Sequence, residues 1–120
     1  MGIRVLVTDD SAFMRNMLKK LITEAGGEIA GEAGDGREAI ERYTQVKPTL
    51  VFMDIMMPNM NGIEALKGII AIDKSAKIVM CTSVGQEKVV NEAVEAGASD
   101  FIVKPFTKED VTTIISKYSS

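Results

Sequence analysis

The sequence predicts an α/β fold in which helices cover both faces of a five-stranded parallel sheet. Five short apolar segments alternate along the chain with five segments of helical periodicity. Strict alternation is typical of right-handed strand–helix–strand units, whose strands run parallel. The central apolar segments do not alternate with polar residues, as expected where helices cover both faces of a sheet. No linker or repeat interrupts the 120 residues, so we expect a single domain over residues 1–120.

The expected strands are short. The first is rich in β-branched residues, which favour strands, and the segment 28–33 is the least apolar, which is typical of an edge strand. The expected strands cover residues 3–7, 28–33, 50–53, 78–81 and 101–103.

The expected helices show apolar residues at steps of three and four. Ser11 is a candidate N-cap for the first helix, and Gly26 and Gly27 should end it. The inward stripes that we expect in the five helices are Met14, Met17, Leu18, Leu21, Ile22 and Ala25; Ala39, Ile40 and Tyr43; Ile63, Leu66, Ile69 and Ile70 in 62–72; Val89, Val90, Ala93 and Val94 in 86–96; and Val111, Ile114, Ile115 and Tyr118.

Composition excludes several kinds of function. The net charge is −3 and no dense run of Lys and Arg occurs, so we expect no nucleic-acid binding. The chain has no apolar run of about 18 residues that could insert into a membrane and no secretory signal, which favours a cytoplasmic protein, expected to be a monomer. With Cys81 as the single cysteine and no histidine, an internal disulfide is impossible, and neither a Cys/His nucleophile nor a zinc site is expected.

Polar residues gather where the expected strands end. Asp9 and Asp10 follow the first strand, Asp54 the third, Thr82 the fourth and Lys104 the fifth. In open α/β sheets, ligands bind beyond the carboxyl ends of the strands. Two like charges 4 Å apart repel by about 4 kcal/mol at an effective dielectric near 20, so three carboxylates at one edge indicate a bound cation. Oxygen ligands suit Mg²⁺.

Together, a metal ion, a lysine and a hydroxyl can hold a phosphoryl group. A carboxylate can accept that group covalently, and Asp54 is the best candidate because it ends a central strand. Taken singly, these residues also allow simpler interpretations. An acidic pair can cap a helix or lie in solvent, Thr82 can cap the following helix, and Lys104 can be a turn residue. The functional interpretation is favoured because all of them occur on one sheet edge.

The motifs in this order resemble the receiver domain of two-component response regulators, over the whole chain. They are the pair Asp9–Asp10, the segment from Asp54 to Gly62, Thr82–Ser83, and Lys104–Pro105–Phe106. The segments 9–15 and 100–106 are similar to the single-domain chemotaxis regulators of that family. The resemblance implies a flavodoxin-like receiver fold, a doubly wound sheet of strand order 2-1-3-4-5.

The resemblance also implies a role for each site residue. Asp54 would be the phosphoacceptor and a metal ligand. Asp10 would bind Mg²⁺ directly, Asp9 through water, and Met56 through its backbone carbonyl. Thr82 and Lys104 would contact the phosphoryl group and act with Asp54 as catalytic residues, with a cis peptide bond between Lys104 and Pro105. Thr82 and Phe101 would form the switch.

Two positions bear on how such a switch would work. Phe101 stands where many family members have Tyr, so an output contact that needs a hydroxyl is lost, while a repacking of the ring remains. Met56 and Val84 flank the site and are apolar, and we expect them to shield Asp54 from water and to slow the loss of the phosphoryl group. The exposed face formed by Lys88, Asn91, Glu92, Glu95 and Phe101 corresponds to the partner-binding face of the family.

The function that follows by resemblance is that of a phosphorylation-activated response regulator, not an enzyme beyond self-phosphorylation and self-dephosphorylation. The phosphoryl donor would be a histidine kinase of the CheA type. With no output domain expected after the fifth helix, the partner would be a flagellar motor switch protein or an adaptor to it. One alternative is a phosphorelay intermediate that passes the group to a histidine phosphotransfer protein. Another is an aspartate-nucleophile phosphatase, although 54–56 lacks the second Asp of its D-x-D motif. A receiver that folds and binds without being phosphorylated is a further alternative.

Overall fold

A computed structural model describes residues 3–57, 60–83 and 86–119. The strands are β1 (Arg4–Thr8), β2 (Glu28–Ala33), β3 (Leu50–Asp54), β4 (Ile78–Thr82) and β5 (Asp100–Val103). The helices are α1 (Ala12–Glu24), α2 (Gly36–Val46), α3 (Gly62–Ile72), α4 (Glu87–Glu95) and α5 (Lys108–Tyr118). The strict alternation confirms the predicted element order, and most boundaries fall within two residues of the prediction.

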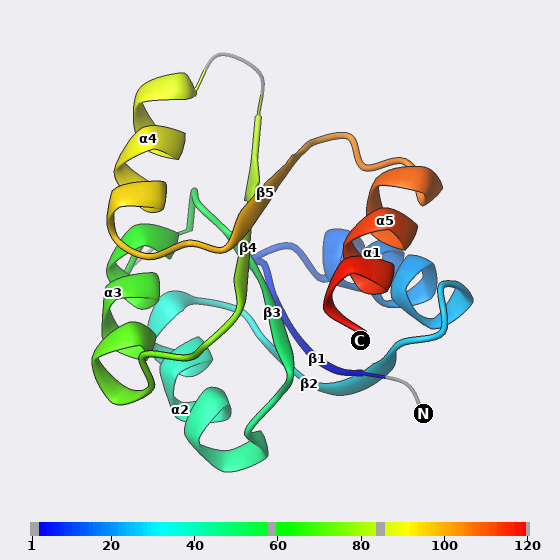
Figure 1. The fold of residues 1–120 in the computed structure, drawn as a ribbon, viewed down its shortest axis with the longest axis horizontal. Helices are drawn as coiled ribbons and strands as arrows, with labels where there is room; N and C mark the ends of the chain where they lie inside the picture. Colours follow the sequence, from blue (N-terminus) through cyan, green and yellow to red (C-terminus); the bar gives the residue numbers. More distant parts are fainter. Residues whose placement is uncertain (1–2, 58–59, 84–85, 120) are drawn as a thin grey trace.

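The five strands form one sheet in the order β2-β1-β3-β4-β5, with every neighbouring pair parallel. This is the predicted fold class and strand order, with β2 at one edge. Helices α1 and α5 cover one face and α2, α3 and α4 the other (Figure 1). The chain therefore reverses its direction of winding between β1 and β3, and the ends of these two strands carry Asp9 and Asp54.

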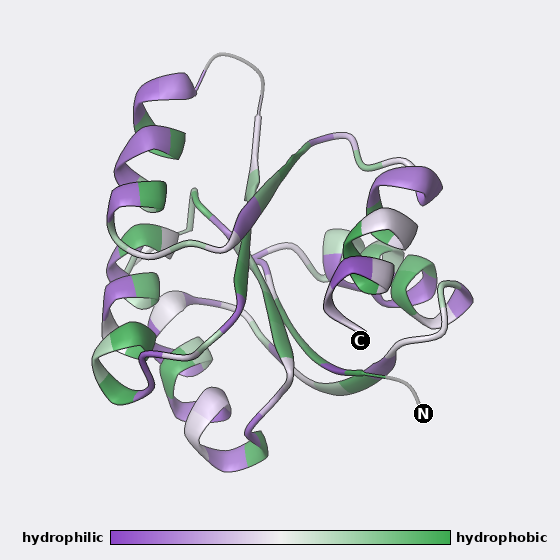
Figure 2. Ribbon diagram, in the orientation of Figure 1, coloured by the Kyte–Doolittle hydropathy of each residue, from purple (hydrophilic) through white to green (hydrophobic). Residues whose placement is uncertain are grey.

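Two apolar layers hold the helices on the sheet. On one face, α1 and α5 pack against every second side chain of β1 and β3, because side chains alternate between the two faces of a sheet. The buried residues that the two helices contribute are Leu18, Ile22, Val111, Ile114 and Ile115. The other layer is built around the helices α2 and α3 and includes a single buried residue of α4, Ala93. Figure 2 shows hydrophobic colouring on the central strands and on the helix sides turned toward them. Both faces of the central strands are thus buried, which explains their unbroken apolar runs.

Helices begin at polar side chains that cap them, as predicted for Ser11. The side chain of Ser11 accepts a hydrogen bond from the Met14 N–H, as expected of an N-cap. The helix α3 begins with a capping box between Asn61 and Glu64. Directly after it, Gly62 packs so closely on β3 that a Cβ atom would overlap the carbonyl oxygen of Asp54. The start of α3 is therefore tied to the end of the strand that carries Asp54.

One predicted inward residue is wrong. Val94 was expected to face the sheet, but 54% of its surface is exposed. The helix α4 is short and lies beside the four-residue strand β5 at the sheet edge. The sheet there is too narrow to cover the whole apolar stripe, so α4 buries Ala93 and leaves Val94 on the surface. The helices of the described ranges are all too short or too polar to cross a bilayer.

Candidate phosphoacceptor and metal site

Three carboxylates meet at the carboxyl ends of β1 and β3. Asp9 follows β1, Asp54 is the last residue of β3, and both are buried, whereas the neighbouring Asp10 is exposed. One oxygen from each of the three lies within 4.8 Å of the others. The sequence placed these groups at one sheet edge, and the structure brings them into a single cluster.

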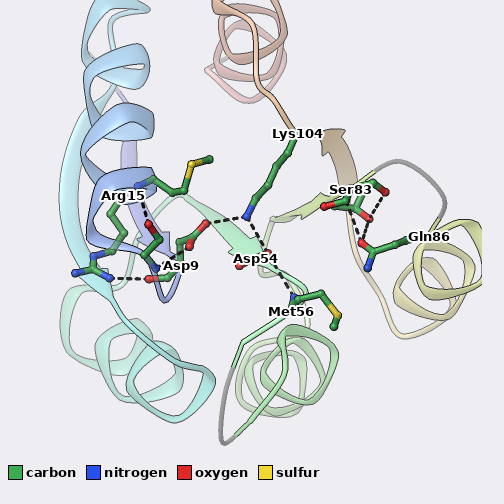
Figure 3. A network of polar contacts seen from close by, with 10 residues as sticks. Asp9, Arg15, Asp54, Met56, Ser83, Gln86 and Lys104 are labelled. Atoms are coloured by element: carbon green, nitrogen blue, oxygen red, sulfur yellow. Dashed lines mark hydrogen bonds and ion pairs between the residues drawn. The ribbon is translucent and has the colours of Figure 1, made fainter.

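Lys104, which follows β5, supplies a positive charge to this cluster. Its Nζ lies 3.1 Å from Oδ2 of Asp9 and 3.2 Å from Oδ1 of Asp54. Figure 3 shows its side chain extending from the segment after β5 to a point between the two carboxylates. The peptide bond between Lys104 and Pro105 is cis, as expected.

The charge balance of the cluster is unfavourable for a fully ionised Asp54. Burial raises the pKa of Asp54, the negative charge of Asp9 raises it further, and Lys104 offsets part of this, so that the pKa lies at about 6. Burial by itself would lower the pKa of Lys104, but the charges of Asp54 and Asp9 outweigh burial and raise it. One lysine therefore does not neutralise the site.

This donor set fits a divalent cation such as Mg²⁺. It consists of carboxylate oxygens, which hard cations prefer, and Asp10 is open to solvent, so that water can complete the coordination. The Met56 N–H donates a hydrogen bond of 3.4 Å to Oδ1 of Asp54. Its backbone therefore runs beside the carboxylate, as expected for a residue whose carbonyl would contribute to such a site.

Arg15 is a part of the site that the sequence interpretation missed. Its Nη1 donates a hydrogen bond of 2.7 Å to the carbonyl oxygen of Asp9, and its Nε donates one of 2.9 Å to Glu32. Lys19 pairs with the same Glu32 at 2.7 Å. The loop is also held by the Ser11 N–H, which donates to Oδ1 of Asp9 at 2.9 Å. Arg15 lies on the polar face of α1, about one turn after the acidic pair. This spacing was the sequence feature that could have indicated its contact with the Asp9 loop.

Thr82 ends β4 and is buried. Its hydroxyl donates a hydrogen bond of 2.8 Å to Oε1 of Gln86, and a longer contact of 3.3 Å joins it to the Ser83 carbonyl. Among the hydrogen bonds of the described residues, this hydroxyl has none to Asp54. Thr82 thus lies at the expected strand end with its hydroxyl committed elsewhere, and Gln86 is the second site residue that the sequence interpretation missed.

Phe101 lies at the exposed side of β5, with 45% of its surface accessible. It lines a groove of about 430 Å³ between β5 and α4, together with Thr82, Val90, Val94 and Val103. Lys88, Asn91, Glu92 and Glu95 on α4 are exposed, as expected for a surface face. The groove joins the buried Thr82 to the surface around Phe101.

The remaining residues named from the sequence either lie outside the described residues or show only their degree of burial. Val84 and Gly85, just before the expected fourth helix, lie outside the described residues, as do Pro58 and Asn59 of the motif after Asp54. The Met56 side chain is 62% exposed, and the shielding expected from Met56 and Val84 stays a prediction. Cys81 is buried and its pKa is raised by that burial, with the charge of Asp54 contributing, which confirms that it is a packing residue.

Comparison with known families decides among the functional classes that such a site allows. The family model of the response regulator receiver domain matches residues 5–116. The chain belongs to this family. The match confirms the predicted family. Receiver domains are signalling domains, not enzymes in the ordinary sense.

The relatives of this receiver domain include chemotaxis regulators. It is 57% identical over 119 residues to the chemotaxis protein CheY of Thermotoga maritima, covering 99% of both chains. It is 49% identical to CheY of Bacillus subtilis, covering 98% of each. These similarities support the predicted function, a phosphorylation-activated response regulator of chemotaxis.

Solved structures agree with the fold. A chain of the CheX–CheY–BeF3–Mg²⁺ complex of Borrelia burgdorferi superposes with a TM-score of 0.92 at 34% identity, covering 98% of this chain and 90% of that one. The response regulator domain of Thermotoga maritima CheB superposes with a TM-score of 0.87 at 40% identity, covering 99% and 95%. The flavodoxin-like receiver fold is confirmed.

Proposed function

We propose that this receiver domain accepts a phosphoryl group on Asp54, in the presence of Mg²⁺, and passes the signal to a separate protein of the chemotaxis system. The arrangement of Asp54 beside Asp9, Asp10 and Lys104 is the observation that carries the proposal. A buried carboxylate flanked by two others and by one lysine is poorly neutralised, and it can hold a metal ion and a phosphoryl group together.

In the reaction, an oxygen of Asp54 forms a bond to phosphorus while the bond between phosphorus and the donor histidine nitrogen breaks. The nitrogen keeps the electron pair of that bond and is protonated by solvent. Mg²⁺, held by Asp9, Asp10, Asp54 and the Met56 carbonyl, would supply positive charge to the phosphoryl oxygens. Lys104, whose Nζ already lies 3.2 Å from Asp54, would pair with one of those oxygens.

The same groups would serve self-phosphorylation from small phosphodonors and self-dephosphorylation by water. Phosphorylation would then draw the Thr82 hydroxyl toward Asp54 and repack the exposed ring of Phe101. Because Thr82 and Phe101 both line the groove between β5 and α4, this movement would change the surface of α4, β5 and α5. A pre-existing equilibrium between two arrangements would shift.

The partners are proposed from the relatives. CheY proteins at 57% and 49% identity favour a donor kinase of the CheA type and a flagellar motor switch protein or adaptor as receiver of the signal. A complex of CheX with CheY is described for the Borrelia protein, so a protein of the CheX kind is a third candidate partner. We also propose that residues 1–120 form one monomeric receiver domain working in the cytoplasm, where kinases use ATP.

The central experiment is phosphorylation by acetyl phosphate and Mg²⁺ of the wild type, of Asp54→Asn, and of Glu41→Gln as a control for an exposed carboxylate. Wild type and Glu41→Gln should gain one phosphoryl group that hydroxylamine removes, as expected of an acyl phosphate. Asp54→Asn should gain none. A wild type that remains unmodified, or an Asp54→Asn variant modified to the same extent, would refute the proposal.

A second experiment separates motor control from phosphorelay. The phosphorylated protein is incubated with a motor switch protein and, separately, with a histidine phosphotransfer protein. Binding to the first that is enhanced by phosphorylation supports the chemotaxis function. Transfer of the phosphoryl group to a histidine of the second supports the relay.

A further inference from the structure

The side chain of Gln86 turns back from the start of α4 to the end of β4. Its Oε1 accepts hydrogen bonds from the Thr82 hydroxyl at 2.8 Å and from the Ser83 N–H at 3.0 Å. Figure 3 shows Gln86 turned toward Ser83 on the side of Asp54 away from Asp9. Gln86 thus links the strand that carries Thr82 to the helix that borders the groove with Phe101.

The direction of the bond between Thr82 and Gln86 is fixed by Ser83. A backbone N–H can only donate, so the atom of the Gln86 amide that faces it must be the oxygen. An amide oxygen carries no hydrogen, and the Thr82 hydroxyl must therefore donate its single proton to it. While this contact exists, Thr82 has no proton left to donate to a phosphoryl group on Asp54.

The same contact withdraws Gln86 from the start of its own helix. Ser11, Asp35, Asn61 and Thr107 each accept a hydrogen bond from the third residue of the helix they begin. Gln86 occupies this position for α4, and its side chain makes no capping hydrogen bond. Its amide oxygen accepts from Thr82 and Ser83 instead, and α4 begins without a side-chain cap.

We propose that Gln86 is a positioning residue that holds the Thr82 hydroxyl in its resting orientation. It thereby sets part of the free energy that phosphorylation must supply to move Thr82 toward Asp54. The inference deepens the proposed function and rests on it. A contact present only in the resting state must be broken when Thr82 turns toward the phosphoryl group. It therefore opposes phosphorylation and lowers the affinity for any mimic of that group.

The test is the affinity for beryllofluoride with Mg²⁺, measured by calorimetry on the full chain. Gln86→Ala removes the acceptor and should bind beryllofluoride about 2- to 10-fold more tightly, as expected from the loss of one hydrogen bond between neutral groups. Gln86→Glu retains an acceptor oxygen and should bind no more tightly than the wild type. Gln45→Ala, the same substitution at an exposed glutamine of α2, should leave the affinity unchanged.

A double-mutant cycle connects the effect to Thr82. In a Thr82→Val background there is no hydroxyl to hold, so the further change Gln86→Ala should not alter the affinity. An equal gain in both backgrounds would overturn the proposal, because Gln86 would then act through α4 and not through Thr82. Wild-type affinity in a folded Gln86→Ala variant would overturn it as well.

A measurement on the wild type alone guards against a variant that does not fold. Nuclear Overhauser effects between the Thr82 and Gln86 side chains should be present in the free protein and lost at saturation with beryllofluoride and Mg²⁺. Effects that persist at saturation would overturn the inference. If the wild type binds no beryllofluoride at all, the proposed function fails instead, and the two failures are therefore distinguishable.

Discussion

The ammonium group of Lys104 lies 3.2 Å from Oδ1 of Asp54, and this ion pair joins β5 to β3 across the intervening strand β4. The same ammonium lies 3.1 Å from Asp9, so a single cation connects the ends of β1, β3 and β5. In the resting site the ammonium of Lys104 thus pairs with the carboxylates of Asp9 and Asp54. A phosphoryl group on Asp54 would give this ammonium a new partner.

Replacing Lys104 by Met should destabilise the metal-free protein by about 2 kcal/mol, because two buried carboxylates lose their shared cation. Mg²⁺ should restore more stability to this variant than it adds to the wild type, since it would replace the missing charge. Urea unfolding with Mg²⁺ or with EDTA measures both effects. Lys67→Met, at an exposed position of α3, is the matched control. An equal response of Lys104→Met and the wild type to Mg²⁺ would contradict this account.

Asp54 should make stability depend on pH in the metal-free protein. Its pKa is about 6 in the folded chain against an ordinary value of 3.8, so the folded state binds the proton more tightly than the unfolded state does. The contribution of Asp54 to stability is then fully present below about pH 4 and is lost as the pH rises through 6. The loss amounts to about 3 kcal/mol.

The measurement is the difference in unfolding free energy between Asp54→Asn and the wild type in EDTA, from pH 4 to pH 7. The difference should grow in favour of Asp54→Asn as the pH rises and level off above about 7. A difference that is flat over this range would mean that Asp54 is not destabilised by its surroundings.

Removing Mg²⁺ should lower the melting temperature of the wild type and leave an Asp10→Asn variant less affected, because a ligand that binds only the folded state stabilises it by mass action. At a hundred times the dissociation constant the gain is about 2.7 kcal/mol. The chain has no Trp, so circular dichroism or calorimetry is the suitable readout. Glu41→Gln, exposed on α2, should respond to Mg²⁺ as the wild type does; a full response of Asp10→Asn would argue against its role as a ligand.

The two phenylalanines near the end of the sheet should differ sharply in their effect on stability. Phe106 is 8% exposed and packs in the layer with α1 and α5, whereas Phe101 is 45% exposed. Phe106→Ala should cost about 3–5 kcal/mol, while Phe101→Ala should cost less than about 1 kcal/mol. Thermal unfolding of both variants measures this. A large loss for Phe101→Ala would mean that its ring is part of the core and is not free to repack.

Much of the fold was predictable because local patterns and packing agree. The continuous apolar runs of β3 and β4, the N-cap Ser11 and the left-handed glycine Gly26 after α1 indicated the right elements. Asp9, Asp54 and Lys104 were predictable as neighbours because parallel strands end at one edge. The hydrogen bonds of Arg15 and Gln86 were not, because they depend on the conformation of long side chains. The exposure of Val94 depended on how narrow the sheet is beside α4, which periodicity does not reveal.

The shallow seating of α4 has a consequence for the history of such a protein. Ala93 is the one residue of Glu87–Glu95 that is buried, so most positions of this helix can be exchanged with little loss of stability. The surface that distinguishes one partner from another can therefore diverge while the acidic cluster and the core stay constant. Signalling pathways within one cell could become insulated from one another in this way, by changes confined to a single helix.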